Sequence, residues 1–318
     1  MKKIVLSLIF TLFIFVSAFA QFDPQYSQYM LNPTAFNPAA AAESGMIDIT
    51  GQHRIQWIGM PNGGQTTNFS IVAPLKINKS LHGLGLSFLN DKAGQFVNQA
   101  VHLKYAYKIP LGEGKLSLGA DIGFVSLGFN GDSVLNHMVS IGDYYDFTSD
   151  PEIPTTSVVG NGFDVNLGAW YSTPDFYTGV SMTHVNQPVI EWGDRTEYRP
   201  ASTLFGTAGY KFSLPGTKYI LKPSTLIKTD FKTMQVDLTG KLEYDNKYWG
   251  GLSYRWEDAV VFFAGINITG GLSIGYSYDL PASQILNVSW GSHEICMIYS
   301  FEYVPQKTTT KYKSIRIL

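Results

Sequence analysis

Cysteine is almost absent from this sequence, and so are long apolar runs. Cys296 is the single cysteine among 318 residues, so neither an intrachain disulfide nor a cysteine-based metal site can form. After residue 20 no run of about 18 consecutive apolar residues occurs, which excludes membrane-spanning helices from the rest of the chain. A membrane barrel built from strands needs no such run, so the sequence leaves that architecture open.

Charge is scarce as well, and it is nearly balanced. Charged residues make up 15% of the chain and the formal net charge is −2, whereas an average domain has about a quarter of its residues charged. No cluster of Lys and Arg combines with aromatic residues in the way that follows a phosphate backbone, so we expect no nucleic-acid partner. Aromatic residues reach 14% and glycine numbers 31, a composition that favours short strands joined by tight turns.

The residues that could carry chemistry do not form a recognisable catalytic or metal site. The six histidines lack any metal-binding spacing such as His-x-x-x-His. Ser292, His293 and Glu294 are adjacent, but along a strand His293 points away from the other two, so they form no triad among themselves. The acidic loop 130–162 lacks the spacing of an EF-hand. We therefore expect no enzyme activity, no cofactor and no bound metal.

The first twenty residues have the features of a secretory signal. Two lysines precede an apolar stretch over Ile4–Val16, and Ala18–Ala20 has the small-x-small form of a cleavage site. The stretch is too short to span a membrane as a helix, and no cysteine follows the site to take a lipid anchor. We predict a signal peptide over 1–20, cleavage after Ala20, and a mature chain that begins in the periplasm at Gln21.

From residue 46 onward, apolar and polar residues alternate with a period of two, which is typical of strands with one apolar and one polar face. Over 235–244, for example, Val236, Leu238 and Leu242 alternate with polar or charged residues. We count about fourteen such segments, with a range of about 12 to 16. Many are about ten residues long, which is enough for a tilted membrane strand. A water-soluble sandwich would alternate in the same way, so periodicity alone does not decide between the two.

The lengths of the connections favour the membrane barrel. Numbered from the first strand, the long connections 58–66, 130–162, 186–201 and 279–291 are all odd, whereas most even connections are tight. Short turns on one side and long loops on the other are the outer-membrane pattern, in which an even strand number leaves both termini in the periplasm. We predict an all-β fold, a transmembrane antiparallel β-barrel over 45–304 with short periplasmic turns and long extracellular loops, followed by a polar tail over 305–318.

The segment 21–44 precedes the first strand and is interrupted by proline. Pro24, Pro33 and Pro38 push the residues before them toward extended geometry, so we expect no continuous helix. Aromatic and aliphatic residues make the segment too apolar for a free linker. We predict a periplasmic segment that either packs against or into the barrel mouth or docks to a partner.

Alternation also predicts which side chains meet where the barrel closes. In the first strand Arg54 and Gln56 fall on the lumen face, whereas Ile55 and Trp57 fall on the lipid face. In the last strand Glu294 falls on the lumen face. The first strand ascends and the last descends, so we predict that Arg54 and Glu294 are neighbours, within the offset that register shear allows.

Several motifs, in order along the chain, resemble the PorP/SprF family of outer-membrane proteins. They are the lead 21–33, the Asn37-Pro38-Ala39 step, Arg54-Ile55-Gln56-Trp57, and the later stretches His184–Pro188, Leu221–Ser224, Gly250–Arg255 and Ser292–Ile295. The chain departs from the family at Ala40–Ala42, where an aromatic residue and then glycine are expected, and at Pro61–Gly64. These departures obscure the subfamily and not the family.

The resemblance implies a non-enzymatic component of the type IX secretion and gliding machinery, which supports secretion or surface attachment of cargo through protein–protein contacts. The implied partners are outer-membrane lipid and either periplasmic secretion-ring components or the sorting domain of a cargo or surface adhesin, within a hetero-complex. The candidate partner or lumen contacts are Tyr26, Tyr29, Asn37, Pro38, Arg54, Gln56, Trp57 and Glu294. Two alternatives stay open: an outer-membrane porin or small-molecule transporter, and an outer-membrane enzyme.

Overall fold

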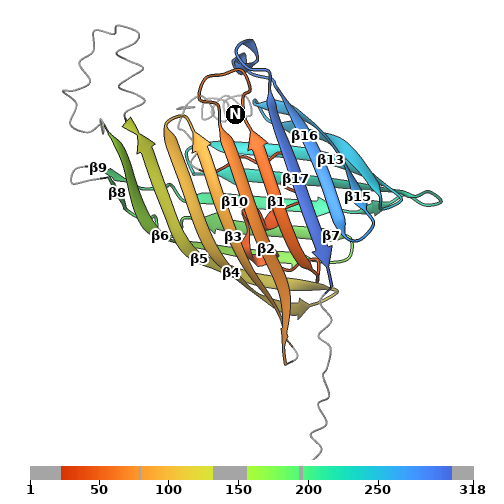
Figure 1. Ribbon diagram of the computed structural model, residues 1–318. Helices are drawn as coiled ribbons and strands as arrows, with labels where there is room; N and C mark the ends of the chain where they lie inside the picture. The colour runs from red at the N-terminus through yellow and green to blue at the C-terminus, as the bar shows by residue number, and fades with distance from the viewer. Residues whose placement is uncertain (1–22, 79, 132–155, 193–195, 303–318) are drawn as a thin grey trace, which may run out of the picture.

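The structure is a computed structural model that describes residues 23–78, 80–131, 156–192 and 196–302 (Figure 1). The predicted signal peptide 1–20, most of the acidic loop 130–162 and nearly all of the predicted tail 305–318 lie outside the described residues. The described residues contain no helix that is long and apolar enough to cross a membrane.

Fourteen long antiparallel strands form one closed barrel. In chain order they are β1 (Ile47–Ile55), β2 (Gln65–Ile77), β3 (Ser80–Ala93), β4 (Phe96–Leu111), β5 (Gly114–Asn130), β6 (Ser157–Ser172), β7 (Phe176–Thr183), β10 (Thr203–Tyr210), β12 (Tyr219–Thr229), β13 (Met234–Tyr244), β14 (Tyr248–Arg255), β15 (Ala259–Ile268), β16 (Leu272–Pro281) and β17 (Ser292–Phe301). The two-residue strand β11 (Phe212–Ser213) adds to β12, and β8 (Ile190–Trp192) pairs with β9 (Thr196–Tyr198) in a separate hairpin. Pairing of β1 with β17 closes the barrel. The predicted fold and strand number are confirmed.

The alternation seen in the sequence gives the barrel an apolar outer face and a polar inner face. On β5, Ile122 and Phe124 are exposed while Asp121 and Val125 are buried. Exposed apolar side chains on a barrel exterior are what a lipid environment requires. Tight turns are made by residues with positive φ, as at Asp245 and Asn246, whose φ values of 54° and 53° suit the twist of a hairpin.

The connections differ in length between the two ends of the barrel. The strands β1, β5, β7 and β16 end, and β2, β6, β10 and β17 begin, at the end that β1 reaches at Ile55, so the four longest connections between barrel strands join strands there, and we call it the long-loop end. The opposite end, which β17 reaches at Phe301, carries most of the tight turns and is called the short-turn end (Figure 1).

The residues before β1 run through the lumen, and we call residues 23–42 the plug. Asp23 lies near the long-loop end, beside Thr183 and Lys228, while Ala42 lies near the short-turn end, beside Lys108. Between them the chain forms two short 3₁₀ turns, η1 (Pro33–Ala35) and η2 (Pro38–Ala40). Proline at the start of each turn fits, because its fixed φ suits a first helical position.

The path of the plug was not expected from the strand number alone. The first described residue, Asp23, lies near the long-loop end and the last strand finishes at the short-turn end, because the segment before β1 passes through the barrel lengthwise before it turns into the wall. Both ends of the chain lie outside the described residues, so their periplasmic location stays a prediction.

Candidate functional site

The barrel closes over a buried ion pair. Arg54 and Glu294 are register partners on β1 and β17, and the Arg54 Nη1 atom lies 3.7 Å from the Glu294 Oε2 atom. Both side chains are almost completely buried. The prediction that these two residues are neighbours at the seam is confirmed.

A second arginine extends this pair into a network. Arg54 Nη2 lies 2.8 Å from Asp279 Oδ2, and Arg255 contacts the same oxygen at 2.9 Å through Nη1. Arg255 also binds Asp237, with Nε 2.9 Å from Oδ1. Sequence reasoning missed Arg255, Asp237 and Asp279, although each lies on the polar face of a strand, because alternation gives the face of a residue and not its partner.

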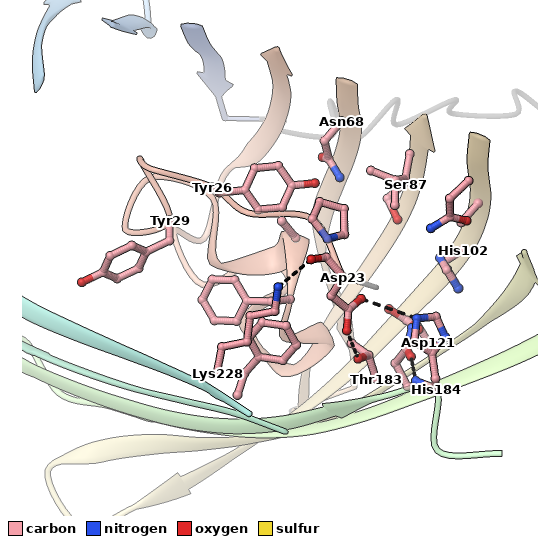
Figure 2. Close-up of a pocket in the computed structure, with 18 of the residues that line it drawn as sticks. Asp23, Tyr26, Tyr29, Asn68, Ser87, His102, Asp121, Thr183, His184 and Lys228 are labelled. Atoms are coloured by element: carbon pink, nitrogen blue, oxygen red, sulfur yellow. Dashed lines mark hydrogen bonds and ion pairs between the residues drawn. The ribbon is translucent and has the colours of Figure 1, made fainter. Parts of the chain in front are cut away.

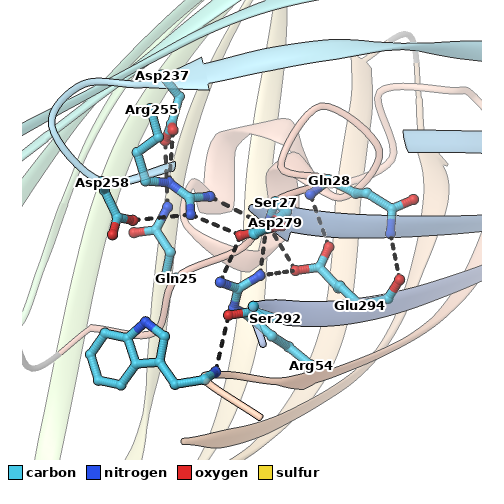
Figure 3. A network of polar contacts seen from close by, with 12 residues as sticks. Gln25, Ser27, Gln28, Arg54, Asp237, Arg255, Asp258, Asp279, Ser292 and Glu294 are labelled. Carbon is cyan, nitrogen blue, oxygen red and sulfur yellow. Dashed lines mark hydrogen bonds and ion pairs between the residues drawn. The ribbon is translucent and has the colours of Figure 1, made fainter. Parts of the chain in front are cut away.

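The plug enters this network through two backbone amides, the Ser27 hydroxyl group and the side-chain amides of Gln25 and Gln28 (Figure 3). The amide groups of Ser27 and Gln28 donate hydrogen bonds to the Glu294 carboxylate, at 2.8 and 2.9 Å. The Ser27 hydroxyl group donates to Asp279 at 2.7 Å and accepts from Arg54 at 2.6 Å. The network thus positions the Ser27-Gln28 step of the plug, where a turn begins, at the barrel seam.

A second polar cluster holds the start of the plug on the other side of the lumen (Figure 2). The His184 ring lies between two carboxylates, with Nε2 3.5 Å from Asp23 and Nδ1 2.9 Å from Asp164. The Asp164 carboxylate also contacts His102 at 3.0 Å. Lys228 Nζ donates to the backbone carbonyl of Asp23 at 2.5 Å.

This arrangement favours the charged forms of the plug carboxylate and of the histidine beside it. Burial alone would raise the pKa of Asp23, but the His184 and Lys228 cations lower it to about 2. Burial alone would lower the pKa of His184, but the carboxylates of Asp23 and Asp164 raise it to about 10. At neutral pH the plug is therefore held here by an ion pair between Asp23 and a protonated His184.

Small residues of the wall allow the plug backbone to approach closely. A Cβ atom added to Gly119 on β5 would overlap the backbone of Ala39, and one added to Gly83 on β3 would overlap the carbonyl of Ala41. The Asn37 side chain accepts from the Ala39 amide at 2.9 Å and donates to the carbonyl of Ala169 at 3.1 Å. The Asn-Pro-Ala step lies directly against the wall for this reason.

Apolar contacts fill the centre of the lumen. Tyr29, Phe36, Phe205 and Leu226 form a buried cluster with Tyr26, and the rings of Phe36 and Phe205 stack with centroids 5.5 Å apart. The Tyr29 hydroxyl group donates to Thr239 at 3.0 Å.

The plug contacts the wall around its whole circumference. Its wall partners, in strand order, are Arg54, Asn68, Gly83, Lys108, Gly119, Ala169, Ser181, Phe205, Lys228, Thr239, Arg255, Asp279 and Glu294. In the part of the chain that the structure describes, no hydrogen bond joins the backbone of the plug to the backbone of a strand. Packing into the barrel, one of the two predicted alternatives for this segment, is what the structure has, and docking to a partner stays a prediction.

The structure separates the eight predicted contact residues into three groups, of which the first is the seam pair of Arg54 and Glu294 described above. Tyr26, Tyr29, Asn37 and Pro38 belong to the plug and are buried. Gln56 and Trp57 follow the end of β1 and line a cavity of about 390 Å³ at the long-loop end. The predicted lipid-facing position of Trp57 is wrong, because its φ of 55° ends the alternation of β1 and turns the residue toward this cavity.

Among the described residues, no group of three or more His, Cys, Asp or Glu side chains could hold a metal ion.

Comparison with known proteins decides the family. The family model of the type IX secretion system membrane protein PorP/SprF matches residues 18–299. The chain belongs to the PorP/SprF family. The predicted family is thereby confirmed, and the chain is an outer-membrane β-barrel of the type IX secretion system. A search of curated proteins finds no match.

Solved structures include similar barrels. A monoaromatic hydrocarbon channel, CymD, is 14% identical, with a TM-score of 0.49 over 90% of this chain and 95% of that one. The outer-membrane protein Omp33 of Acinetobacter baumannii is 10% identical, with a TM-score of 0.47 over 80% of this chain and 98% of that one. The toluene transporter TodX of P. putida is 10% identical, with a TM-score of 0.44 over 84% and 93%. At these values the likeness carries no argument about function.

Proposed function

We propose that this PorP/SprF protein is a non-enzymatic component of the type IX secretion and gliding machinery. It supports secretion or surface attachment of cargo through protein–protein contacts within a hetero-complex. The observation that carries the proposal, besides family membership, is the filled lumen: side chains from all sides of the barrel hold residues 23–42 in place. Because its own chain occupies the lumen, the barrel is suited to presenting its surfaces to other proteins and not to passing cargo through its centre.

The porin alternative is disfavoured for the state with the plug in place. Free diffusion needs an open aqueous lumen, as in porins, whereas Tyr29, Phe36 and Phe205 form an apolar cluster across the middle of this one. The enzyme alternative is disfavoured because the buried histidine and carboxylates near the plug are engaged with one another.

The long-loop end offers a surface for a protein partner. Trp290 is 80% exposed, and Leu286 and Val288 beside it are also exposed. The backbone of this loop is tied to the β1–β2 loop, because Trp290 N donates to Ile58 O at 2.7 Å and Ile58 N donates to Gly291 O at 2.8 Å. With long loops on the cell exterior, this uncharged apolar surface faces the cargo side.

Deletion of the protein, and its replacement by a Trp290→Ala variant, test the proposal in cells. Deletion should abolish surface display of at least one cargo adhesin, and Trp290→Ala should reduce it severalfold while the barrel still assembles. Trp256→Ala is the matched control, because Trp256 is also exposed, at 61%, but lies in a different loop. Unchanged cargo display after deletion would overturn the proposed function. Pull-down from detergent-solubilised outer membrane identifies the partner.

A further inference from the structure

The lumen wall behind the plug is an ionic surface, and many of its charges are paired with one another. Lys104 Nζ lies 2.9 Å from Asp121, and Asn166 donates to the same carboxylate at 2.6 Å. Arg255 on β14 likewise binds Asp237 on the neighbouring β13 and Asp279 on β16, two strands away. The plug itself has a single charged residue, Asp23, between residues 23 and 42. The wall charges are therefore not placed there to neutralise the plug.

A permanently dry lumen would gain little from such a wall. Buried ion pairs are expensive to desolvate, and well-packed apolar residues in their place are often equally or more stabilising. Polar and charged inner faces are typical of barrels that hold water. Because the wall pairs its own charges, water could take the place of the plug and leave few wall charges uncompensated.

The plug can also detach from the wall without breaking the sheet. The backbone-to-backbone hydrogen bonds of the plug are internal, for example from Leu31 N to Gln28 O and from Ala41 N to Pro38 O, and the wall reaches the plug backbone only through side chains. Release therefore breaks side-chain contacts but no strand pairing in the described barrel. Ala42 and Gly45 adopt positive φ values of 57° and 75°, and Gly45 is exposed at the short-turn end. These residues form a hinge between the plug and β1.

We propose that the plug is a gate. Its release about the hinge at residues 42–45, toward the short-turn end, converts the barrel into a water-filled channel for small hydrated inorganic ions. The nearly even mixture of Arg, Lys, Asp and Glu on the wall gives this channel weak selectivity between cations and anions. The proposal concerns an activity of the barrel itself and does not depend on the cargo role.

Bilayer recordings in KCl test the gate on the full-length chain. Gly119→Ala places a methyl group against the backbone of Ala39 in the plug, and the three atoms nearest to that methyl group all belong to the plug. Gly206→Ala is the matched control, because its methyl group meets nothing within 4 Å. We expect mean current to rise on the order of tenfold for Gly119→Ala and to stay at the wild-type level for Gly206→Ala. Equal currents for the two variants would count against a gate.

Removal of residues 23–42 gives the stronger version of the test. If this variant keeps the heat-modifiable migration of a folded barrel and conducts KCl steadily, the wall is a channel as proposed. If it folds and does not conduct, the lumen is closed without the plug and the proposal is wrong. Should it not fold, hydrogen exchange of the full-length protein decides: plug amides must exchange together and faster than those of β1 and β17. Exchange of plug and strand amides at one common rate would refute the gate.

Discussion

Glu294 contacts three different parts of the barrel interior through one carboxylate. Its carboxylate accepts two consecutive amide groups of the plug, accepts from Gln52 at 2.9 Å, and faces Arg54 across the seam. Charge-assisted hydrogen bonds of this kind are stronger than neutral ones. One carboxylate therefore joins the first strand, the last strand and the plug.

Replacing this carboxylate by an amide should weaken both the seam and the plug. An amide oxygen can keep one of the bonds to the plug, but its NH₂ group faces further donors, and the charge opposite Arg54 is lost. We expect Glu294→Gln to lower the free energy of unfolding in detergent by about 1–3 kcal/mol, the usual effect of leaving buried polar groups unpaired. Glu302→Gln, at an exposed position, should change it by less than about 0.5 kcal/mol. Equal effects of the two variants would exclude this role for Glu294.

The ion pair between Asp23 and His184 predicts how attachment of the plug depends on pH. The pKa of His184 is about 10 in the folded protein, against an ordinary value of 6.5, so its contribution to the attachment of the plug is full below about 6.5 and is lost as the pH rises through about 10. The pKa of Asp23 is about 2, against 3.8, so its contribution is full above about 3.8 and is lost as the pH falls through about 2.

Hydrogen exchange of the plug amides measures this dependence. Protection of the plug should be constant between about pH 4 and 6.5 and should then fall progressively toward pH 10, after correction for the intrinsic rate of exchange. A His184→Gln variant should have lower protection and no alkaline decline. An alkaline decline that persists in His184→Gln would assign the effect to another group.

At the scale of elements, the short turn η2 shows how local sequence and the wall combine. Proline at its start and the Asn37 side chain before it give the turn a cap of its own. The same Asn37 amide donates to Ala169 on β6 and to Val180 on β7. A single side chain thus fixes the conformation of the turn and its position against two strands.

Asn37→Ala should loosen this half of the plug selectively. Loss of a side-chain cap costs about 1 kcal/mol, and the two carbonyl contacts add to the loss. We expect amide exchange over residues 37–41 to rise at least tenfold, with a smaller rise around Ser27. Asn267→Ala is the control, since Asn267 binds the Asn246 carbonyl at a turn outside the lumen. A uniform change across the whole plug would show that it moves only as one unit.

At the scale of the molecule, the barrel was predictable from the sequence and the course of the plug was not. A period of two reports the face on which a side chain lies, so the strands and the meeting of Arg54 with Glu294 follow from it. It does not report contacts across the lumen, such as those of Ser27 with Glu294, which lie 267 residues apart. Proline and apolar residues in the segment before β1 indicated packing, but no local signal encodes the direction in which that segment passes through the barrel.

The direction of the plug predicts which parts of the protein each side of the outer membrane can reach. If the long loops face the exterior, Asp23 lies near the cell surface although the chain enters β1 from the periplasmic side. A cysteine introduced at Asn287, in an exposed long loop, should react with a membrane-impermeant maleimide on intact cells. A cysteine introduced at Glu113, in an exposed short turn, should react only after the outer membrane is permeabilised. The native Cys296 is 1% exposed and should contribute no background while the barrel is folded. The reverse labelling pattern would show that the barrel has the opposite orientation in the membrane. The plug would then start at the periplasmic mouth, and its hinge would face the exterior.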